Sequence, residues 1–464
     1  MSAVSYQGEV VAPQIDFDMR RTVAPRYKWL KVPLNNMASN SVTLSNGTTT
    51  VLEWKLPTRV YNLARSYISA TVYAAKGAVG TFNNMYEDTF DLGNNITFGS
   101  SQGVDLVNLS FAGNYAKIIR RIDTKLEDYL GNDVMTNLYK CNSTAALNIL
   151  PATNTGASDN YLETQYISQG VAATAGAGVG DLYRYRQYPL GIFSGTLLGV
   201  DRDFYAPIEQ YLRITAGIPE KATWNTATAD PTNTPIVNAT GITYSNLYLY
   251  LCVEQNPVIV LGMVKRYEER KMVYRIPYTT GFKTVGTTSI GSITNVNLNF
   301  PQQYGKRLKR IIHTPYYPVE TLNTAYDCDN TGGKKIITYQ TSLDSQQLQD
   351  HPLNCALPGN GLANLEDWSQ NKKYMEKSVY TSKESYQRNW FHVDQFYEPR
   401  DKDAIVDLAD ANIDEGLLMD SSKQWLFSAT VGASGAQGNQ GLVHYTFAEF
   451  QREVAMTELG GVFV

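Results

Sequence analysis

The chain reads Thr50-Val51-Leu52-Glu53-Trp54-Lys55-Leu56-Pro57 in its first half and Thr294-Asn295-Val296-Asn297-Leu298-Asn299-Phe300-Pro301 in its second. In both stretches apolar residues alternate with polar ones, which is the period of a strand with one buried face. Each stretch ends at a proline, which has no N–H to donate to a neighbouring strand. The repeat predicts two strand-rich domains of one kind in a single chain. The spacing beyond the prolines differs by one residue (Pro57 to Leu63, Pro301 to Leu308), so chance similarity remains an alternative.

Composition supports an all-β chain with two domains. At 464 residues the chain exceeds what one hydrophobic core usually supports. Its 43% hydrophobic and 18% charged residues are typical of a globular protein. The 32 tyrosines, with frequent Asn, Thr, Ser and Gly, favour strands joined by turns over helices. A net charge of −4 argues against a dedicated nucleic-acid-binding protein, which normally carries a basic surplus.

Apolar periodicity locates the expected elements. Strands are predicted in the first half at 27–32, 48–56, 66–74, 191–200, 211–215, 244–253 and 258–264. Strands are predicted in the second half at 272–277, 311–313, 335–339, 425–431, 442–447 and 450–454. Steps of three and four predict helices over 104–130 and 362–374. The apolar run 247–264 is interrupted by Glu254-Gln255-Asn256-Pro257, which predicts a hairpin instead of a membrane helix.

Two long polar segments and one charged segment divide the chain. Residues 141–181 and 220–243 have little apolar content, so they are exposed functional loops or locally disordered. The charged stretch 265–271 at the midpoint predicts a domain boundary, with a solvated strand end as the alternative. The expected division is an N-terminal arm 1–26, a first β-domain 27–265, a second β-domain 266–455 and a C-terminal tail 456–464.

Histidines and cysteines are the residue types most able to build a metal or catalytic site. The four histidines are His313, His351, His392 and His444. They are far apart in sequence and have no helical or finger spacing, so only folding could assemble a site from them. The four cysteines are Cys141, Cys252, Cys328 and Cys355. Their lack of CxxC spacing favours free thiols in a reducing compartment over two disulfides.

Other short motifs are weak. The stretch 327–332 resembles the opening of a calcium loop, but Thr338 stands where a bidentate Glu is needed, which favours an Asx-rich turn. The glycine-rich stretches 176–180 and 332–335 lack the spacing of phosphate-binding loops. No catalytic, cofactor or metal site is therefore predicted. An enzyme of this length usually shows a motif, so this pattern favours a protein whose function is its shape.

Two charged clusters have both a functional and a structural interpretation. Glu87, Asp88 and Asp91 would supply a carboxylate pair for glycoside hydrolysis, although carboxylates this close in sequence more often only solvate a loop. The basic patch 306–310 would contact nucleic acid or anionic lipid. A strand edge protected by Lys and Arg against mispairing explains that patch equally well.

Three stretches resemble viral major capsid proteins of the double jelly-roll lineage. They are Leu56 to Ser66, Phe300 to Ile312 and Thr341 to Leu348, and the layout is similar over residues 27–455. Adenovirus hexons, several membrane-containing phages and many large or satellite-type DNA viruses of eukaryotes share this family. The resemblance implies two fused eight-stranded jelly rolls, standing side by side, with a few helices and long loops. The helix predicted over 104–130 is longer than such a fold leads one to expect.

The resemblance also implies a function and partners. Three copies would form a pseudo-hexagonal capsomer, and capsomers would build an icosahedral shell with minor capsid or penton proteins. The protein would be a virion component assembled inside the host cell, with no enzymatic activity, no cofactor and no specific nucleic acid. The polar segments 141–181 and 220–243 would rise outward, and the arms would tie capsomers together or meet an internal membrane. Two alternatives stay open: a single-jelly-roll capsid protein with a projecting domain, and a carbohydrate-binding β-sandwich.

Overall fold

The structure is a computed structural model. It describes residues 24–44, 48–74, 84–86, 95–122, 166–167, 182–217, 223–224, 242–270, 273–286, 293–300, 306–316, 336–355, 366–375, 390–396, 416–419, 422–431, 442–458 and 460–463. Most of the predicted arm and of the two polar segments lies outside these residues. In the polar segments the structure describes β8 (Tyr166–Ile167) and β12 (Thr223–Trp224), which pair with β5 (Asn84–Tyr86) in a small sheet.

The first half of the chain forms two antiparallel sheets. One has the strand order β1 (Tyr27–Pro33), β13 (Ile242–Glu254), β4 (Val60–Ala74), β10 (Asp203–Tyr205), extended by β2 (Val42–Leu44) and β9 (Leu182–Pro189). The other has the order β3 (Thr49–Leu56), β11 (Gln210–Gly217), β6 (Asn95–Gly99), β7 (Asp105–Ser110). The first and last long strands of this half, β1 and β13, are therefore neighbours.

The second half repeats this arrangement. One sheet has the order β14 (Val273–Val285), β23 (Val443–Thr457), β16 (Arg307–Tyr316), β20 (His392–Gln395), extended by β21 (Leu417–Leu418) and β24 (Gly460–Phe463). The other has the order β15 (Ile293–Asn299), β22 (Gln424–Val431), β17 (Ile336–Leu343), β18 (Gln346–Gln347), with β19 (Leu353–Asn354) also on β17. Again the first and last long strands, β14 and β23, are neighbours.

The two halves correspond strand for strand, and each has the two four-stranded paths of a jelly roll. The repeated stretches of sequence are β3 and β15, the equivalent edge strands of the two sandwiches. Their alternation is confirmed by burial. Leu52 and Trp54 of β3 and Val296 of β15 are fully buried, and Leu298 is nearly so. The predicted all-β double jelly roll is confirmed.

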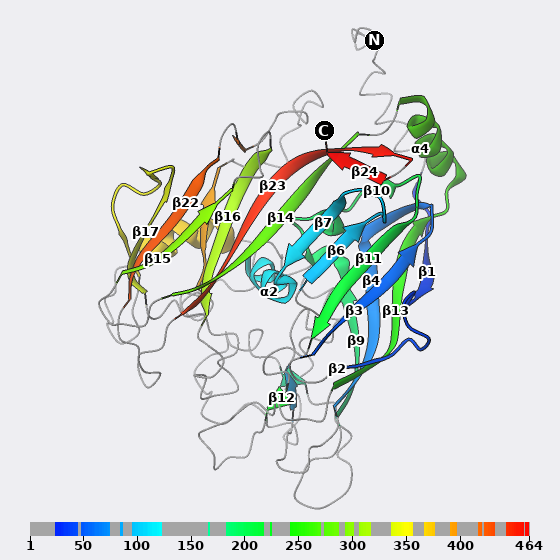
Figure 1. Cartoon of the computed structure of the whole chain (residues 1–464), viewed down its shortest axis with the longest axis horizontal. Helices are drawn as coiled ribbons and strands as arrows, with labels where there is room; N and C mark the ends of the chain where they lie inside the picture. The colour runs from blue at the N-terminus through cyan, green and yellow to red at the C-terminus, as the bar shows by residue number, and fades with distance from the viewer. Residues whose placement is uncertain are drawn as a thin grey trace, which may run out of the picture.

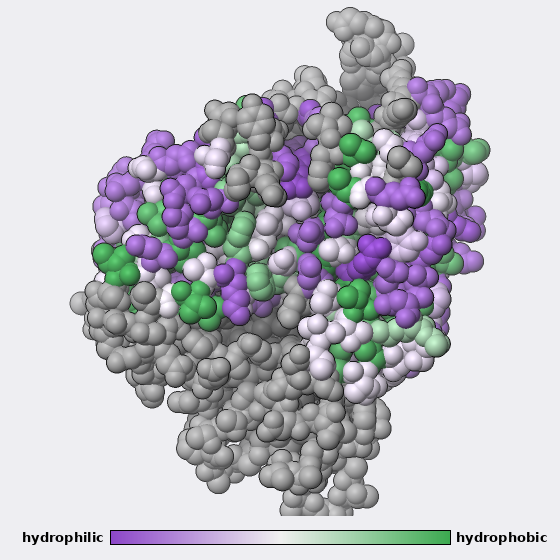
Figure 2. All heavy atoms as spheres, in the orientation of Figure 1, coloured by the Kyte–Doolittle hydropathy of each residue, from purple (hydrophilic) through white to green (hydrophobic). Residues whose placement is uncertain are grey.

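The four large sheets lie side by side in Figure 1, with β17, β22 and β15 at one end and β13 and β1 at the other. The sheet of β14 and β23 lies next to β7, so the two sandwiches pack against each other. In Figure 2 hydrophobic residues on the visible side form small patches between hydrophilic ones. Among the described residues, no helix combines the length and apolar character needed to cross a membrane.

The helix predicted over 104–130 is wrong in its first part. Residues 105–110 form β7, and the helix α2 begins only at Ala112 and is described to Ile122. Phe111 between them has a φ of 58°, which turns the chain sharply from strand to helix. The apolar residues 104, 107 and 111 fit a helical spacing, but pairing of β7 with β6 overrides that local preference.

Two strands predicted in the first half are also wrong. Residues 258–264 lie in the helix α4 (Pro257–Arg270). Asn256 caps this helix by accepting a hydrogen bond from the Val258 N–H at 3.0 Å, and proline is favoured at the first helical position. Residues 191–200 form two short 3-10 helices, η4 (Leu190–Ile192) and η5 (Leu197–Gly199), the second capped by the Thr196 side chain.

The remaining predictions agree with the described elements. The other predicted strands fall within β1, β3, β4, β11 and β13, and within β14, β16, β17, β22 and β23. The helix α5 (Glu366–Met375) confirms the helix predicted over 362–374. The charged stretch 265–271 lies largely in the C-terminal half of α4, so it is not a strand end. In the predicted tail 456–464, β24 pairs with the end of β23.

Candidate functional site

The surface where the two sandwiches meet, called the seam below, is formed by α2, β7 and the η4–η5 segment of the first sandwich and by β14 and β23 of the second. Aromatic rings from both sides pack edge to face. The ring centroids of Phe111 and Tyr445 are 5.4 Å apart, and those of Tyr115 and Phe447 are 5.1 Å apart. Such pairs contribute beyond simple area burial. The seam is therefore built like a protein core.

A buried trio, the ion pair Arg310–Glu449 and the neutral Tyr115, lies in the seam. The Tyr115 hydroxyl donates to Glu449 Oε1 at 2.6 Å, and Arg310 donates to both carboxylate oxygens of Glu449, at 2.5 and 3.1 Å. The Arg310 and Glu449 side chains are only 11% and 7% exposed. Burial, reinforced by the charge of Glu449, holds the pKa of Tyr115 well above its usual value, so this phenol remains a hydrogen-bond donor. The trio links the first sandwich to β23 and β16 of the second.

The backbone of the first sandwich comes close to the second sandwich next to this trio. The Gly195 N–H donates to the Tyr115 hydroxyl at 3.0 Å, and the Thr279 hydroxyl donates to the Gly195 carbonyl at 2.6 Å. A Cβ atom at Gly195 would collide with Tyr115 and Glu449, and one at Gly281 would collide with the Ser110 carbonyl. Glycine at these two positions allows the two sandwiches to touch without a gap.

A second contact lies toward α4. The Tyr274 hydroxyl donates to the Tyr205 carbonyl at 3.0 Å and accepts from the Tyr205 N–H at 3.2 Å. Its ring packs on Phe204 with centroids 5.0 Å apart. Burial raises the pKa of Tyr274 to about 12. At the chain end, the Val104 N–H donates to the Gly461 carbonyl at 3.0 Å, so β24 also holds the first sandwich.

The basic patch 306–310 is not a protected strand edge, so that interpretation is wrong. β16 begins at Arg307 and is paired on both sides, with β23 on one and with β20 and β21 on the other. Arg310 is buried on Glu449, which removes it from any patch for nucleic acid or lipid. Burial, with a smaller contribution from Arg452, lowers the pKa of Lys306 to about 8.

Folding brings three of the four histidines into the core of the second sandwich. His313 Nε2 lies 3.2 Å from His444 Nδ1, and His313 Nδ1 lies 2.8 Å from the Thr446 hydroxyl. Burial holds the pKa of His313 well below its usual value and lowers that of His444 to about 4. His351 is exposed, 3.6 Å from Glu366. Within the described part of the chain, no group of three or more His, Cys, Asp or Glu is placed to hold a metal ion.

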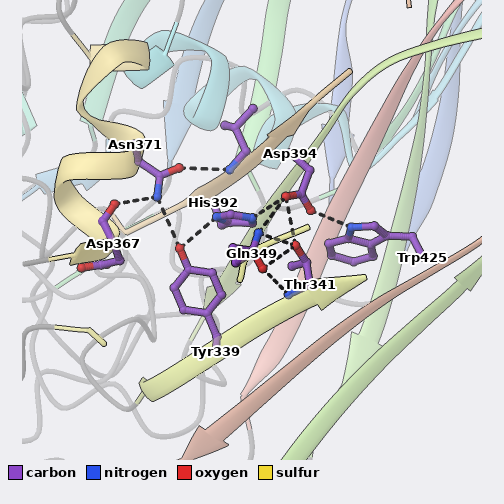
Figure 3. Close-up of polar contacts among 9 residues, drawn as sticks. Tyr339, Thr341, Gln349, Asp367, Asn371, His392, Asp394 and Trp425 are labelled. Carbon is purple, nitrogen blue, oxygen red and sulfur yellow. Dashed lines mark hydrogen bonds and ion pairs between the residues drawn. The ribbon is translucent and has the colours of Figure 1, made fainter. Parts of the chain in front are cut away.

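His392 belongs to a neighbouring polar network around Asp394 (Figure 3). His392 Nε2 lies 2.9 Å from Asp394 Oδ1, and its Nδ1 lies 2.9 Å from the Tyr339 hydroxyl. Asp394 also accepts hydrogen bonds from Trp425 Nε1 at 2.8 Å and from the Thr341 hydroxyl at 3.0 Å. A Tyr–His–Asp chain resembles a catalytic relay, but all three side chains are at least 95% buried. Its hydrogen bonds connect β17, β20 and β22, which is a structural role.

The same network fastens α5 to the second sandwich. Asn371 accepts a hydrogen bond from the Val393 N–H at 3.2 Å and donates to the Asp367 carbonyl at 2.9 Å. Trp390 Nε1 donates to Asp367 Oδ2 at 2.7 Å. Asp367 and Asn371 are almost fully buried, whereas Ser369 and Gln370 on the other side of α5 are exposed. The helix is therefore fixed by the side that carries Asp367 and Asn371 (Figure 3).

Most of the other predicted candidates lie outside the residues that the structure describes. The stretches 176–180, 327–332 and 332–335 and the carboxylates Glu87, Asp88 and Asp91 lie outside the described residues, and Thr338 lies in β17. Cys252 and Cys355 are buried free thiols, and burial raises the pKa of Cys252 to about 11. Cys141 and Cys328 also lie outside the described residues.

Known proteins resemble this chain in fold. No protein-family model and no curated protein sequence matches it. A chain of the PBCV-1 virus capsid matches with a TM-score of 0.52 at 10% identity, covering 95% of this chain and 97% of the other. A chain of the Sputnik virophage matches with a TM-score of 0.52 at 11% identity, covering 95% and 89%. Both are double jelly-roll major capsid proteins. The chain therefore has the double jelly-roll fold of these viral major capsid proteins.

Proposed function

We propose that the chain is a structural major capsid protein and a component of an icosahedral virion. The observation that carries this proposal is the pair of complete, equivalent jelly rolls joined through a buried seam. Packing two sheets face to face in each sandwich buries the inner side of every long strand, which suits a rigid building block. We place the domain boundary within α4, dividing the chain at residues 265 and 266.

The finer proposal is a homotrimer. Two similar sandwiches per chain give six in three copies, so a ring of three chains approximates a hexagonal tile. Head-to-tail contacts close into such a ring when the rotation between copies allows it. Capsomers of this kind would contact one another and minor capsid or penton proteins in the shell.

Light scattering coupled to size-exclusion chromatography tests the trimer. The purified chain is expected to elute at micromolar concentration with three times the mass of one chain, because the interfaces of obligate assemblies are large. Negative-stain images of the same fraction should show hexagonal outlines. A monodisperse monomer would contradict the proposal.

The two alternatives predict other structures. A single jelly roll with a projecting domain requires unlike halves, whereas the sheets here correspond strand for strand. A carbohydrate-binding sandwich requires exposed aromatic residues beside a carboxylate pair, and the candidate pair lies outside the described residues. Binding on a glycan array would favour that alternative.

An internal membrane is a further partner in this proposal, and α4 is the surface that suits it. Val258 and Leu261 of α4 are 57% and 67% exposed, and the exposed Lys265 and Arg266 follow. The N-terminal arm leaves beside this helix, since Asn256 donates to the Ala24 carbonyl at 2.9 Å. Apolar residues next to basic ones favour binding to an anionic lipid surface.

Replacing Leu261 with Asp is expected to reduce flotation of the protein with anionic vesicles by about tenfold, because a carboxylate replaces an apolar contact with lipid. Ile293→Asp is a matched control, since Ile293 is 60% exposed on β15, away from α4. Equal flotation of Leu261→Asp and the wild-type chain would exclude α4 as the lipid-binding surface.

A further inference from the structure

The first two turns of α4 are apolar but are not buried. Residues 257–264 are Pro-Val-Ile-Val-Leu-Gly-Met-Val, and each of them is half-buried or exposed. Val258 and Leu261 are exposed, and a Cβ atom at Gly262 would meet no described atom within 4 Å. The described residues therefore leave an apolar surface of α4 open, and we call this surface the exposed side of α4.

The helix is held to the first sandwich mainly by one aromatic residue. Within the described part of the chain, Tyr267 is the α4 residue that packs against the hydrophobic core, and its ring lies 5.8 Å from that of Tyr205. The helix lies at the edge of the molecule, at the upper right of Figure 1. Apolar residues gathered on an exposed helix are typical of a binding surface.

The N-terminal arm joins the described chain beside the first turn of this helix. Asn256, which caps α4, donates a hydrogen bond from its side chain to the Ala24 carbonyl at 2.9 Å. The Gln255 N–H donates to the Arg26 carbonyl at 2.7 Å. The buried Glu254 carboxylate accepts from the N–H groups of Arg26 and Asn256, at 2.8 and 2.7 Å. The base of the arm and the start of α4 are thus fixed together.

The arm is long enough to reach every part of α4. The helix has 14 residues and is therefore about 21 Å long. Residues 14–18 precede Ala24 by six to ten residues, and an extended chain of that length spans about 20–33 Å. Because the arm is tethered beside the helix, its effective concentration at α4 is high.

The sequence of residues 14–18 has apolar residues that suit the exposed side of α4. The stretch reads Gln-Ile-Asp-Phe-Asp, so in an extended chain Ile15 and Phe17 point to one side, about 7 Å apart. Val258 and Leu261 are three residues apart on a helix, which places their Cβ atoms about 5–6 Å from each other. Two apolar side chains of the arm therefore have two apolar partners at a similar spacing.

The charges of the two segments are complementary. Asp16 and Asp18 flank Phe17 in the arm, and the exposed Lys265 and Arg266 follow Leu261 on α4. The long Lys and Arg side chains can extend along apolar surface to reach carboxylates. Lys265 lies 3.6 Å from Glu269, but this ion pair is largely exposed and contributes little, so it does not prevent such a contact.

We propose that residues 14–18 of the arm cover the exposed side of α4 in the same chain and thereby block its binding to lipid. An anionic bilayer would displace the arm and take its place on Val258 and Leu261. The inference rests on the lipid-binding surface proposed for α4 and names what controls access to that surface.

Ile15→Ser with Phe17→Ser in the full chain tests this contact by flotation with vesicles of phosphatidylcholine and phosphatidylserine. An arm that covers α4 for about nine-tenths of the time lowers the apparent affinity for lipid about tenfold. The double variant is therefore expected to bind these vesicles about tenfold more tightly than the wild-type chain. The control is Val10→Ser with Val11→Ser, which removes two apolar side chains elsewhere in the arm and should bind as the wild-type chain does.

The direction of the change decides between the possible roles of the arm. Weaker flotation of the Ile15 and Phe17 double variant would show that the arm itself binds lipid and would overturn the inference. Equal flotation of the double variant and the wild-type chain would overturn it as well. Absence of flotation in both chains would overturn the lipid surface proposed for α4, and with it the blocking role of the arm.

Cross-linking of the unmodified protein without lipid tests the position of the arm by itself. A zero-length amine–carboxylate reagent should join Lys265 to Asp16 or Asp18. In a sample assembled from unlabelled and heavy-isotope-labelled chains, both linked peptides should carry the same label. Links between peptides of different label would place the arm on another copy, and absence of the link would leave α4 uncovered. Either result would overturn the inference, whatever the vesicles show.

Discussion

Glu449→Ala is expected to lower the free energy of unfolding by about 3–5 kcal/mol, because it removes the carboxylate that neutralises Arg310 inside the seam. The Arg310 and Glu449 side chains are only 11% and 7% exposed, so water cannot replace the lost partner. The Tyr115 hydroxyl loses its acceptor in the same variant. Urea unfolding followed by circular dichroism and tryptophan fluorescence measures the change.

The same strand supplies a matched control. Glu453, also on β23, pairs with Arg275 at 2.7 Å, but these side chains are 42% and 38% exposed. Glu453→Ala should therefore cost less than about 1 kcal/mol. The double variant Arg310→Met with Glu449→Met should recover most of the loss, because an apolar pair of similar volume leaves no buried charge. Similar losses for Glu449→Ala and Glu453→Ala would show that the seam is solvated.

Lowering the pH from 7 to 5 is expected to destabilise the second sandwich by about 4 kcal/mol, about 2 kcal/mol for each of His313 and His444. In the unfolded chain both imidazoles bind a proton near their ordinary pKa of 6.5. In the folded chain burial keeps them neutral, and the pKa of His444 is about 4. Between pH 6.5 and about 4 the unfolded chain therefore binds more protons than the folded chain, so the free energy of unfolding falls as the pH drops below 6.5.

Urea titrations at pH 7, 6 and 5 measure this dependence. The surroundings contain the aromatic rings of Trp390, Trp425 and Phe427, and His392 is the titratable neighbour. His444→Gln should reduce the pH slope between 5 and 6.5 by about half, because His313 still contributes, whatever the effect of the variant on stability at pH 7. His351→Gln should leave the slope unchanged, since that imidazole is 63% exposed. An equal slope in His444→Gln and the wild-type chain would contradict the prediction.

The sequence predicts the double sandwich because apolar and polar residues alternate in the edge strands β3 and β15. β3 and β15 each bury one face only, so their polar residues remain visible between apolar ones. The spacing of apolar residues is less informative where tertiary contacts determine whether a segment is a strand or a helix. Residues 104–111 have a helical spacing yet extend along β6, and residues 258–264 are apolar in every position but Gly262 and form a helix.

The seam could not be predicted because its members are distant in sequence. Arg310 and Glu449 are 139 residues apart, and Tyr115 and Glu449 are 334 apart. In the sequence Arg310 stands out only as part of the basic patch 306–310. It is buried because β16 is an interior strand. The histidines likewise meet only because β16 and β23 are neighbours, which no spacing along the chain reveals.

The pairing of first and last strands has a consequence for biosynthesis. Every strand of the first sandwich, from β1 to β13, is complete when Glu254 has left the ribosome, so this half has all its partners before α4 is made. The second half must wait for β23, the last long strand of that half and the partner of β14. Glu449 and Gly461, which contact the first sandwich, are therefore made only after that sandwich has all its strands.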